Sequence, residues 1–392
     1  MRHVFPVRLM ISTEDGALPL TDQRAEIPLP RGPLPSTPVL HYGPYLSSLA
    51  RFFAEGDYAL LRGSLSTLLQ KPVFMEDITS MEIISEKHGA YYHVARIRVT
   101  LLETVCFLGV NVAVTSPQHV AMEREFQVLT ELRDRFQLPY LPRPFLTGEA
   151  PYSDPFQGNS KSNLLKLLVV EWFEGYHEFH LSINNRSTTP EVKVWEIHEK
   201  GEFLDAEETR SLYHQSAYIL TSYLDDTSFR HIYPWHHGSG DFVVLRTADG
   251  PRVRLITARD YRPVAAWSSE SKDPWVAALH FFFTLTVRMR LDRLDGTGPL
   301  TWAPAESLTG VLTGFFAAWS KKAESNRTLP PHDALLNLFC HMSPSEWLSF
   351  GEVILEDCAV EEEELPFLGA RMEEHAAALV KTLKDNFRRD PA

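Results

Sequence analysis

The stretch His231-Ile-Tyr-Pro-Trp-His-His-Gly-Ser-Gly-Asp-Phe-Val-Val244 passes from a polar, glycine-containing segment directly into an apolar run. The apolar run predicts a β-strand from Phe242 to Leu245, and a second strand, Val253–Ile256, follows across the turn Thr247–Gly250. The polar segment Thr257-Ala-Arg-Asp-Tyr261 comes after the second strand. Two strands joined by a short turn form a hairpin, so the sequence predicts two polar loops side by side at its open end.

Length and composition restrict the classes of protein to which the chain can belong. A chain of 392 residues is too long for one compact core, so we expect two lobes and an extension. The net charge of −13 disfavours nucleic acid as a partner, since a broad basic surface is missing. The longest strongly apolar run, at residues 278–287, is far shorter than the ~20 residues that cross a bilayer, so we expect no membrane span.

The cysteines indicate the compartment. Cys106, Cys340 and Cys358 are widely spaced and form no CxxC pair, which argues against a disulfide framework. The sequence therefore predicts a reducing environment and a cytoplasmic location.

Residues 1–76 read as an N-terminal extension. The first 44 residues are rich in proline and turn formers, which predicts an extended, irregular arm. Apolar residues at helical spacing then predict two short helices, over Tyr45–Ala54 and Tyr58–Leu69.

Residues 77–175 read as a β-rich lobe with one long helix. Strands are predicted around Met81–Ser85 and Tyr91–Thr100, and residues 103–115 supply one more strand or a strand pair. Ser116-Pro-Gln predicts a helix start, and that helix runs to Phe136. Two further strands follow, and the apolar run Leu164–Val170 is typical of a central, buried strand.

Residues 176–392 read as a mainly helical lobe. Asp205 followed by acidic residues predicts a helix start, and the hairpin described above comes next. The helices predicted after the hairpin are 274–293, 305–322, 332–340, 344–356 and 364–387.

This order of elements resembles the protein-kinase-like fold, and the aminoglycoside and choline phosphotransferase group is the most similar variety. The resemblance covers residues 77–390. It implies an α+β, two-lobed architecture with an antiparallel-sheet N-lobe over residues 77–175 and a mainly helical C-lobe over residues 176–392.

The resemblance assigns residues that would contact a nucleotide. In the family, the first hairpin covers ATP phosphates, and Gly89 stands in that turn here. A lysine at the end of the third strand pairs with a helix glutamate; Thr115 occupies the lysine position and Glu125 matches the glutamate. The alternative interpretations need no ligand: Gly89 would belong to a plain hairpin turn, and Glu125 would be a solvated glutamate on a helix.

The segment Val169–Gly175 resembles the family hinge, whose backbone pairs with an adenine edge. Glu171 and Phe173 would then lie beside the nucleotide. A central strand that ends in a turn is the alternative interpretation of this segment.

The catalytic loop of the family reads His-Gly-Asp, four residues, Asn and a short strand. Aligning its strand on Phe242 places Asp241 at the magnesium-binding asparagine and His236 at the catalytic aspartate. Thr257 replaces the aspartate of the metal loop, and Asp260 follows three residues later. The resemblance thus implies His236, Asp241 and Asp260 as catalytic residues, with Asp241 and Asp260 as Mg²⁺ ligands.

Two other groups of side chains have the chemistry of metal ligands. His231, His236, His237 and Asp241 could form a transition-metal site, although adjacent histidines rarely bind one ion. The segment His177-Glu-Phe-His180 has a ligand-like i, i+3 spacing but no third ligand nearby in the sequence. Hydrogen-bonded loop histidines are the alternative in both cases.

The leading prediction is a catalytically degenerate or atypical kinase-like protein, a pseudokinase, that binds a small ligand or a partner protein in the cleft between its lobes. One alternative is an active small-molecule or sugar phosphotransferase that uses ATP and Mg²⁺. A second alternative is a metal-dependent enzyme built on the histidine-rich loop.

Overall fold

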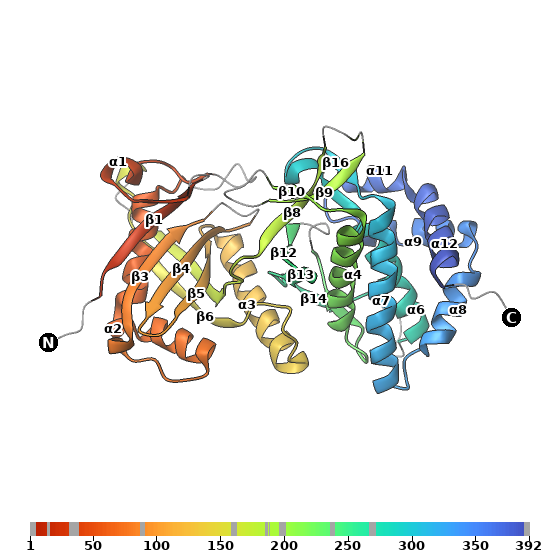
Figure 1. The fold of residues 1–392 in the computed structure, drawn as a ribbon, viewed down its shortest axis with the longest axis horizontal. Helices are drawn as coiled ribbons and strands as arrows, with labels where there is room; N and C mark the ends of the chain where they lie inside the picture. The colour runs from red at the N-terminus through yellow and green to blue at the C-terminus, as the bar shows by residue number, and fades with distance from the viewer. Residues whose placement is uncertain are drawn as a thin grey trace. The chain divides into compact units, whose positions relative to one another are not determined.

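The computed structural model describes residues 5–13, 16–30, 39–86, 91–157, 163–184, 187, 189–195, 201–235, 240–265 and 272–387. The chain divides into two compact units. Met1–Gln137 and Pro142–Glu174 form the first, and Leu138–Leu141 and Gly175–Ala392 form the second. The fold is mixed α+β: the first unit contains the largest of the sheets described, which is mostly antiparallel, and the second contains most of the described helices (Figure 1).

A seven-stranded sheet in the order β2-β1-β3-β4-β5-β7-β6 forms the centre of the first unit. Its strands are β1 (Val7–Thr13), β2 (Gly16–Pro19), β3 (Ile78–Ser85), β4 (His93–Leu101), β5 (Val105–Ala113), β6 (Pro144–Tyr152) and β7 (Asn163–Glu171). Neighbouring strands run antiparallel except β1 and β3, which run parallel. Leu165 and Leu167 of β7 are fully buried, which confirms the predicted buried strand, but β7 lies next to the edge strand β6 rather than at the centre of the sheet.

The irregular N-terminal arm is a wrong prediction for Val7–Pro19. Val7–Ile11 pairs in register with Met81–Ser85, so β1 extends the sheet, and β2 pairs with β1. Pro6 precedes β1 and Pro19 ends β2, positions where a missing N–H interrupts little of a ladder. Proline content therefore misled the prediction. Residues 31–38 of the arm lie outside the described residues.

One face of this sheet is covered by α2 (Tyr42–Leu69), which follows the short helix α1 (Asp22–Ala25). The two helices predicted here are the two halves of α2, because the chain leaves the helical conformation between Glu55 and Tyr58. Gly56, Asp57 and Tyr58 all have positive φ there. Buried side chains from α2 join those of the strands in one core; among them are Tyr45, Leu46, Leu49, Phe53, Ile83, Ile97, Val110 and Val169.

The long helix α3 spans Ser116–Phe136, which are the predicted bounds. Its N-cap is Thr115 rather than Ser116, and Gln118 completes a capping box. The helix contacts β5, β6 and β7 and buries Met122, Leu129 and other residues. It ends where Gln137 takes a left-handed conformation, with φ of 53°.

The second unit contains a five-stranded sheet in the order β10-β9-β8-β12-β13. Its strands are β8 (His177–Ile183), β9 (Pro190–Val194), β10 (Glu202–Phe203), β12 (Phe242–Thr247) and β13 (Gly250–Leu255). The hairpin predicted from the sequence is β12 and β13, which pair from Phe242↔Leu255 to Thr247↔Gly250. Two short ladders add β11 (Arg230–Ile232) with β14 (Tyr261–Pro263), and β15 (Leu291–Arg293) with β16 (Leu300–Trp302).

Helices make up most of the remainder of the second unit, coloured green to blue in Figure 1. They are α4 (Ala206–Ser222), α6 (Pro274–Arg288), α7 (Ala305–Ser325), α8 (His332–His341), α9 (Pro344–Val353), α10 (Leu355–Cys358), α11 (Glu364–Gly369) and α12 (Met372–Phe387). Helices occupy each of the predicted segments, but three predictions need correction. The helix expected over 274–293 ends at Arg288, and the chain continues into β15. The helices expected over 344–356 and 364–387 are each divided in two, into α9 and α10 and into α11 and α12.

The helices α4 and α7 pack closely against each other. Gly310 and Gly314 of α7 lie against the backbone of Arg210 and His214, so that a Cβ at either glycine would clash with a carbonyl oxygen of α4. Within the described part of the chain, every helix is too short or too polar to span a bilayer.

Candidate functional site

The two polar loops expected from the sequence meet within the second unit. The β12–β13 hairpin brings together the residues that precede β12 and those that follow β13. The ladder of β11 and β14 then pairs His231 with Arg262 and Ile232 with Tyr261, and so ties the start of the first loop to the end of the second. The hairpin prediction therefore placed these loops correctly.

Asp241 is held by an arginine of the opposite loop. Arg259 donates from both terminal nitrogens to the two carboxylate oxygens of Asp241, at 2.6 and 2.7 Å. The Asp241 side chain is 3% exposed and that of Arg259 is 20% exposed. This bidentate geometry is the strongest form of a charge-assisted contact, and it occupies the carboxylate that the resemblance assigns to a metal.

Asp260 lies next to this pair in the sequence but has a different local role. Its carboxylate accepts from the backbone N–H of Tyr261 at 2.7 Å, and its carbonyl accepts from the N–H of Tyr233 at 3.1 Å. Thr257, at the position of the family's metal-binding aspartate, is buried. Asp260 thus helps to join the two loops through backbone contacts.

His231 is a buried, uncharged histidine. Burial lowers its pKa, with further lowering by the charges of His280 and Arg262, to about 3. Its ring stacks on Tyr233 at 5.3 Å and meets the edge of Phe281 at 5.5 Å. An imidazole that stays neutral near pH 7 and packs between aromatic rings acts as a structural residue here.

The buried side chain of Arg288 contacts the backbone of Trp235, the last described residue of the first loop before Gly240. Arg288 of α6 is fully buried and donates to the Trp235 carbonyl at 2.9 Å and the Glu364 carboxylate at 2.8 Å. Glu364 also accepts from the N–H of Val360 at 2.7 Å. His236 and His237, which follow Trp235, lie outside the described residues.

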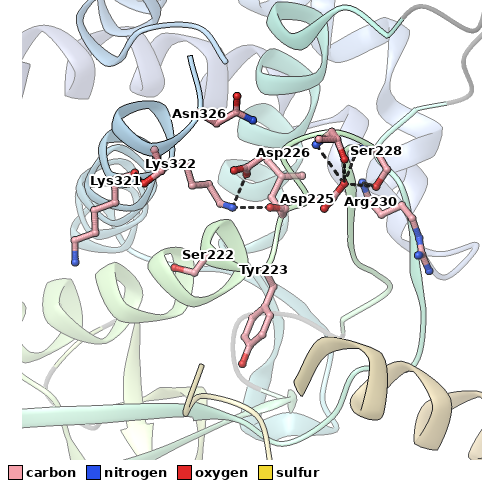
Figure 2. Close-up of polar contacts among 12 residues, drawn as sticks. Ser222, Tyr223, Asp225, Asp226, Ser228, Arg230, Lys321, Lys322 and Asn326 are labelled. Atoms are coloured by element: carbon pink, nitrogen blue, oxygen red, sulfur yellow. Dashed lines mark hydrogen bonds and ion pairs between the residues drawn. The ribbon is translucent and has the colours of Figure 1, made fainter. Parts of the chain in front are cut away.

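The segment before β11 is ordered by a second buried carboxylate. Asp225 accepts from the N–H and hydroxyl of Ser228 at 2.5 Å each (Figure 2), and from the N–H and hydroxyl of Thr227 at 3.2 and 2.9 Å. Lys322 of α7 donates to Asp226 at 2.7 Å and to the Leu224 carbonyl at 2.6 Å (Figure 2). These contacts set the path of the chain into His231.

The residues assigned to phosphate binding lie in the first unit. Gly89 is outside the described residues. At the position of the family lysine, the N–H and hydroxyl of Thr115 both donate to the Gln118 amide oxygen, at 3.0 and 3.1 Å. The Gln118 amide nitrogen donates in turn to the Tyr91 carbonyl at 2.8 Å. Glu125 is buried on α3, with 1% exposure.

In the hinge-like segment Val169–Gly175, the side chain of Glu171 is held by an ion pair. Glu171 forms a bidentate pair with Arg143, at 3.0 and 3.2 Å, while Phe173 is half-buried. Lys166 of β7, which is not among the predicted site residues, has its ammonium nitrogen 3.0 Å from a carboxylate oxygen of Glu123 on α3. Lys166 is the one charged residue in the apolar run Leu164–Val170, and that interruption is the signal that could have indicated it.

The secondary structure argues against the second candidate metal site, the segment His177–His180. His177 and His180 lie on the strand β8, so residues three apart project to opposite faces. Burial would lower the pKa of His180, but the carboxylates of Asp292 and Glu178, 3.8 and 3.9 Å from its ring nitrogens, raise the pKa to about 9. Among the residues that the structure describes, no group of three or more His, Cys, Asp or Glu side chains is arranged to hold a metal ion.

No protein-family model and no curated protein matches this chain. The geometry of the loops is therefore the basis for a functional assignment.

Proposed function

We propose that this chain is a kinase-like protein that does not carry out ordinary ATP-dependent phosphoryl transfer and that acts by binding a small ligand or a partner protein. The observation that carries the proposal is the bidentate pair between Asp241 and Arg259, at 2.6 and 2.7 Å. A divalent cation at this position would need the same carboxylate oxygens. To bind there, it would have to displace a guanidinium whose charge repels it.

The kinase-like part of the proposal is supported by the order and pairing of elements. In the first unit, α3 follows β5 in the chain and precedes β6 and β7, and it packs on these three strands. In the second unit, α4 precedes the hairpin of β12 and β13, and helices follow it. The resemblance to the kinase-like fold rests on this order of elements: strands, a helix, a further buried strand, a second helix and a hairpin.

The loss of ordinary nucleotide binding is supported by the first unit. Thr115 stands where the family has a phosphate-binding lysine, and its polar groups are engaged by Gln118. Each charge-assisted hydrogen bond to phosphate that is lost this way is worth roughly 1.5–3 kcal/mol.

One observation favours the active phosphotransferase as a second candidate. Lys166 and Glu123 form an ion pair between a strand and the long helix, at 3.0 Å. Kinases use a pair of a strand lysine and a helix glutamate beside the nucleotide phosphates. Lys166 could act for the missing lysine if the nucleotide lay against β7.

Titration calorimetry of the full chain with ATP and GTP, with and without Mg²⁺, tests the proposal. We expect no magnesium-dependent binding at millimolar nucleotide. Lys166→Met is measured beside wild type, and Lys384→Met, an exposed lysine of α12, serves as the matched control. Tight magnesium-dependent ATP binding that Lys166→Met abolishes and Lys384→Met leaves intact would replace the proposal with the active enzyme.

A further inference from the structure

Three tyrosines and two cations from five segments of the second unit form a row. Arg254 of β13 lies over the rings of Tyr140 and Tyr176, at 5.8 and 5.7 Å. The Tyr140 ring meets the edge of Tyr218 of α4 at 6.2 Å. Lys321 of α7 lies over the Tyr218 ring at 5.1 Å and donates to its hydroxyl at 2.8 Å. We call these five residues the tyrosine–cation row.

The row is part of the surface rather than of the core. Its three tyrosines and Arg254 are half-buried, and Lys321 is exposed. Figure 2 shows the Lys321 side chain directed away from Lys322 and Asp226, so it takes no part in that buried network. Tyrosine and arginine are among the residue types that are enriched at protein interfaces.

We propose that the tyrosine–cation row is a docking surface for an acidic segment of a partner protein. The argument is charge complementarity: the chain as a whole carries a net charge of −13, whereas this row presents an arginine and a lysine that are held by aromatic rings. An ammonium group has three donors, and the hydroxyl of Tyr218 takes one from Lys321. Carboxylates of a partner can accept from the others.

The arrangement of the rings favours a protein over single-stranded nucleic acid. Bases bind by stacking on free aromatic faces. The Tyr218 ring has Lys321 over one face and the near-parallel His214 ring with its centroid 6.4 Å away, and Arg254 lies over the Tyr140 ring. The proposal does not depend on the kinase-like assignment, and nucleotide titrations leave it untouched.

Fluorescence anisotropy with a labelled random copolymer of glutamate and tyrosine tests the proposal on the full chain. We expect binding that weakens when salt is raised, and a loss of affinity of about fivefold or more in the double variant R254Q/K321Q. Lys381→Gln with Lys384→Gln on α12 makes the same change in net charge at exposed positions outside the row. That control double variant should bind the copolymer as wild type does.

Three results would overturn the proposal. One is no binding of the copolymer by wild type; another is equal weakening in both double variants, which would indicate general charge attraction. The third is tighter binding of oligothymidylate than of the copolymer, with the same sensitivity to R254Q/K321Q, which would make the row a nucleic-acid surface. Because Lys321 is exposed, K321Q alone should keep the wild-type melting temperature and still weaken binding.

Discussion

At the scale of single residues, the pair of Asp241 and Arg259 decides how the candidate site is interpreted. The aspartate is buried and the arginine is partly exposed, with side chains 3% and 20% accessible. Removing the arginine takes the opposite charge away from a carboxylate that is almost fully buried, whereas removing the aspartate leaves a guanidinium that is partly exposed to water. The two partners are therefore unequal in their importance for stability.

We predict that Arg259→Leu lowers the free energy of unfolding by about 3 kcal/mol, and that Asp241→Leu lowers it by roughly half as much. Denaturant unfolding of the two variants checks the order. Arg259→Lys keeps the charge but not the two parallel hydrogen bonds, so we expect a loss between that of wild type and Arg259→Leu. Equal losses from Arg259→Leu and Asp241→Leu would contradict the predicted inequality.

His231 leads to a prediction about acid stability. Its folded pKa is about 3, below the value of about 6.5 in the unfolded chain, so the unfolded state binds more protons between these values. Stability is therefore lost as pH falls from 6.5 towards 3, by an amount on the order of 4 kcal/mol. His231→Phe keeps an aromatic ring against Tyr233 and Phe281 and does not titrate. We expect its acid-unfolding midpoint to lie at lower pH than that of wild type; an unchanged midpoint would contradict this role.

At the scale of elements, the contact between α4 and α7 depends on two glycines of α7. A Cβ at Gly314 would clash with the carbonyl oxygen of His214, and the backbone of α4 cannot move away locally. The helices can approach this closely only because glycine has no side chain.

We predict that Gly314→Ala lowers the free energy of unfolding by about 1–3 kcal/mol or more. Gly63 is the matched control: it is also a helical glycine, and a Cβ there meets nothing within 4 Å. Gly63→Ala should be neutral or stabilising by up to about 1 kcal/mol, because alanine has the higher helix propensity. Melting curves of both variants make the comparison, and a stable Gly314→Ala protein would mean that α7 can shift on α4.

At the scale of the whole molecule, the stability should depend on pH from both sides of neutrality. On the alkaline side the group is His180, whose folded pKa of about 9 lies above the unfolded value of about 6.5. The folded state then binds the proton more tightly. Its contribution is complete below pH 6.5 and is lost as pH rises through 9, by up to about 3 kcal/mol.

We predict that His180→Gln is less stable than wild type at pH 6 and that the difference shrinks by pH 10. Unfolding curves across this range measure the difference. A difference between His180→Gln and wild type that stays constant with pH would show that the ring contributes by packing alone. Asp292→Asn, which removes the carboxylate 3.8 Å from the ring, should flatten the same alkaline loss.

The sequence by itself determined the elements whose signals are local. The helix bounds Ser116–Phe136, the interruption of α2 near Glu55 and the hairpin of β12 and β13 all agree with the structure. Helix caps, turn residues and apolar periodicity are signals within a few neighbouring residues, so they do not depend on where the segment lies in the folded protein. The meeting of the two polar loops also followed, since a hairpin brings its ends together.

Only the tertiary structure decided which distant groups become partners. β1 joins the sheet by parallel pairing with β3, some 70 residues away in the chain, although its proline-rich surroundings predict an irregular arm. Arg259 takes the carboxylate of Asp241 rather than a neighbour on its own loop, and Arg288 fixes the backbone of Trp235. The physical reason is that a buried polar group must find a hydrogen-bond partner, and packing in three dimensions decides which groups lie within reach.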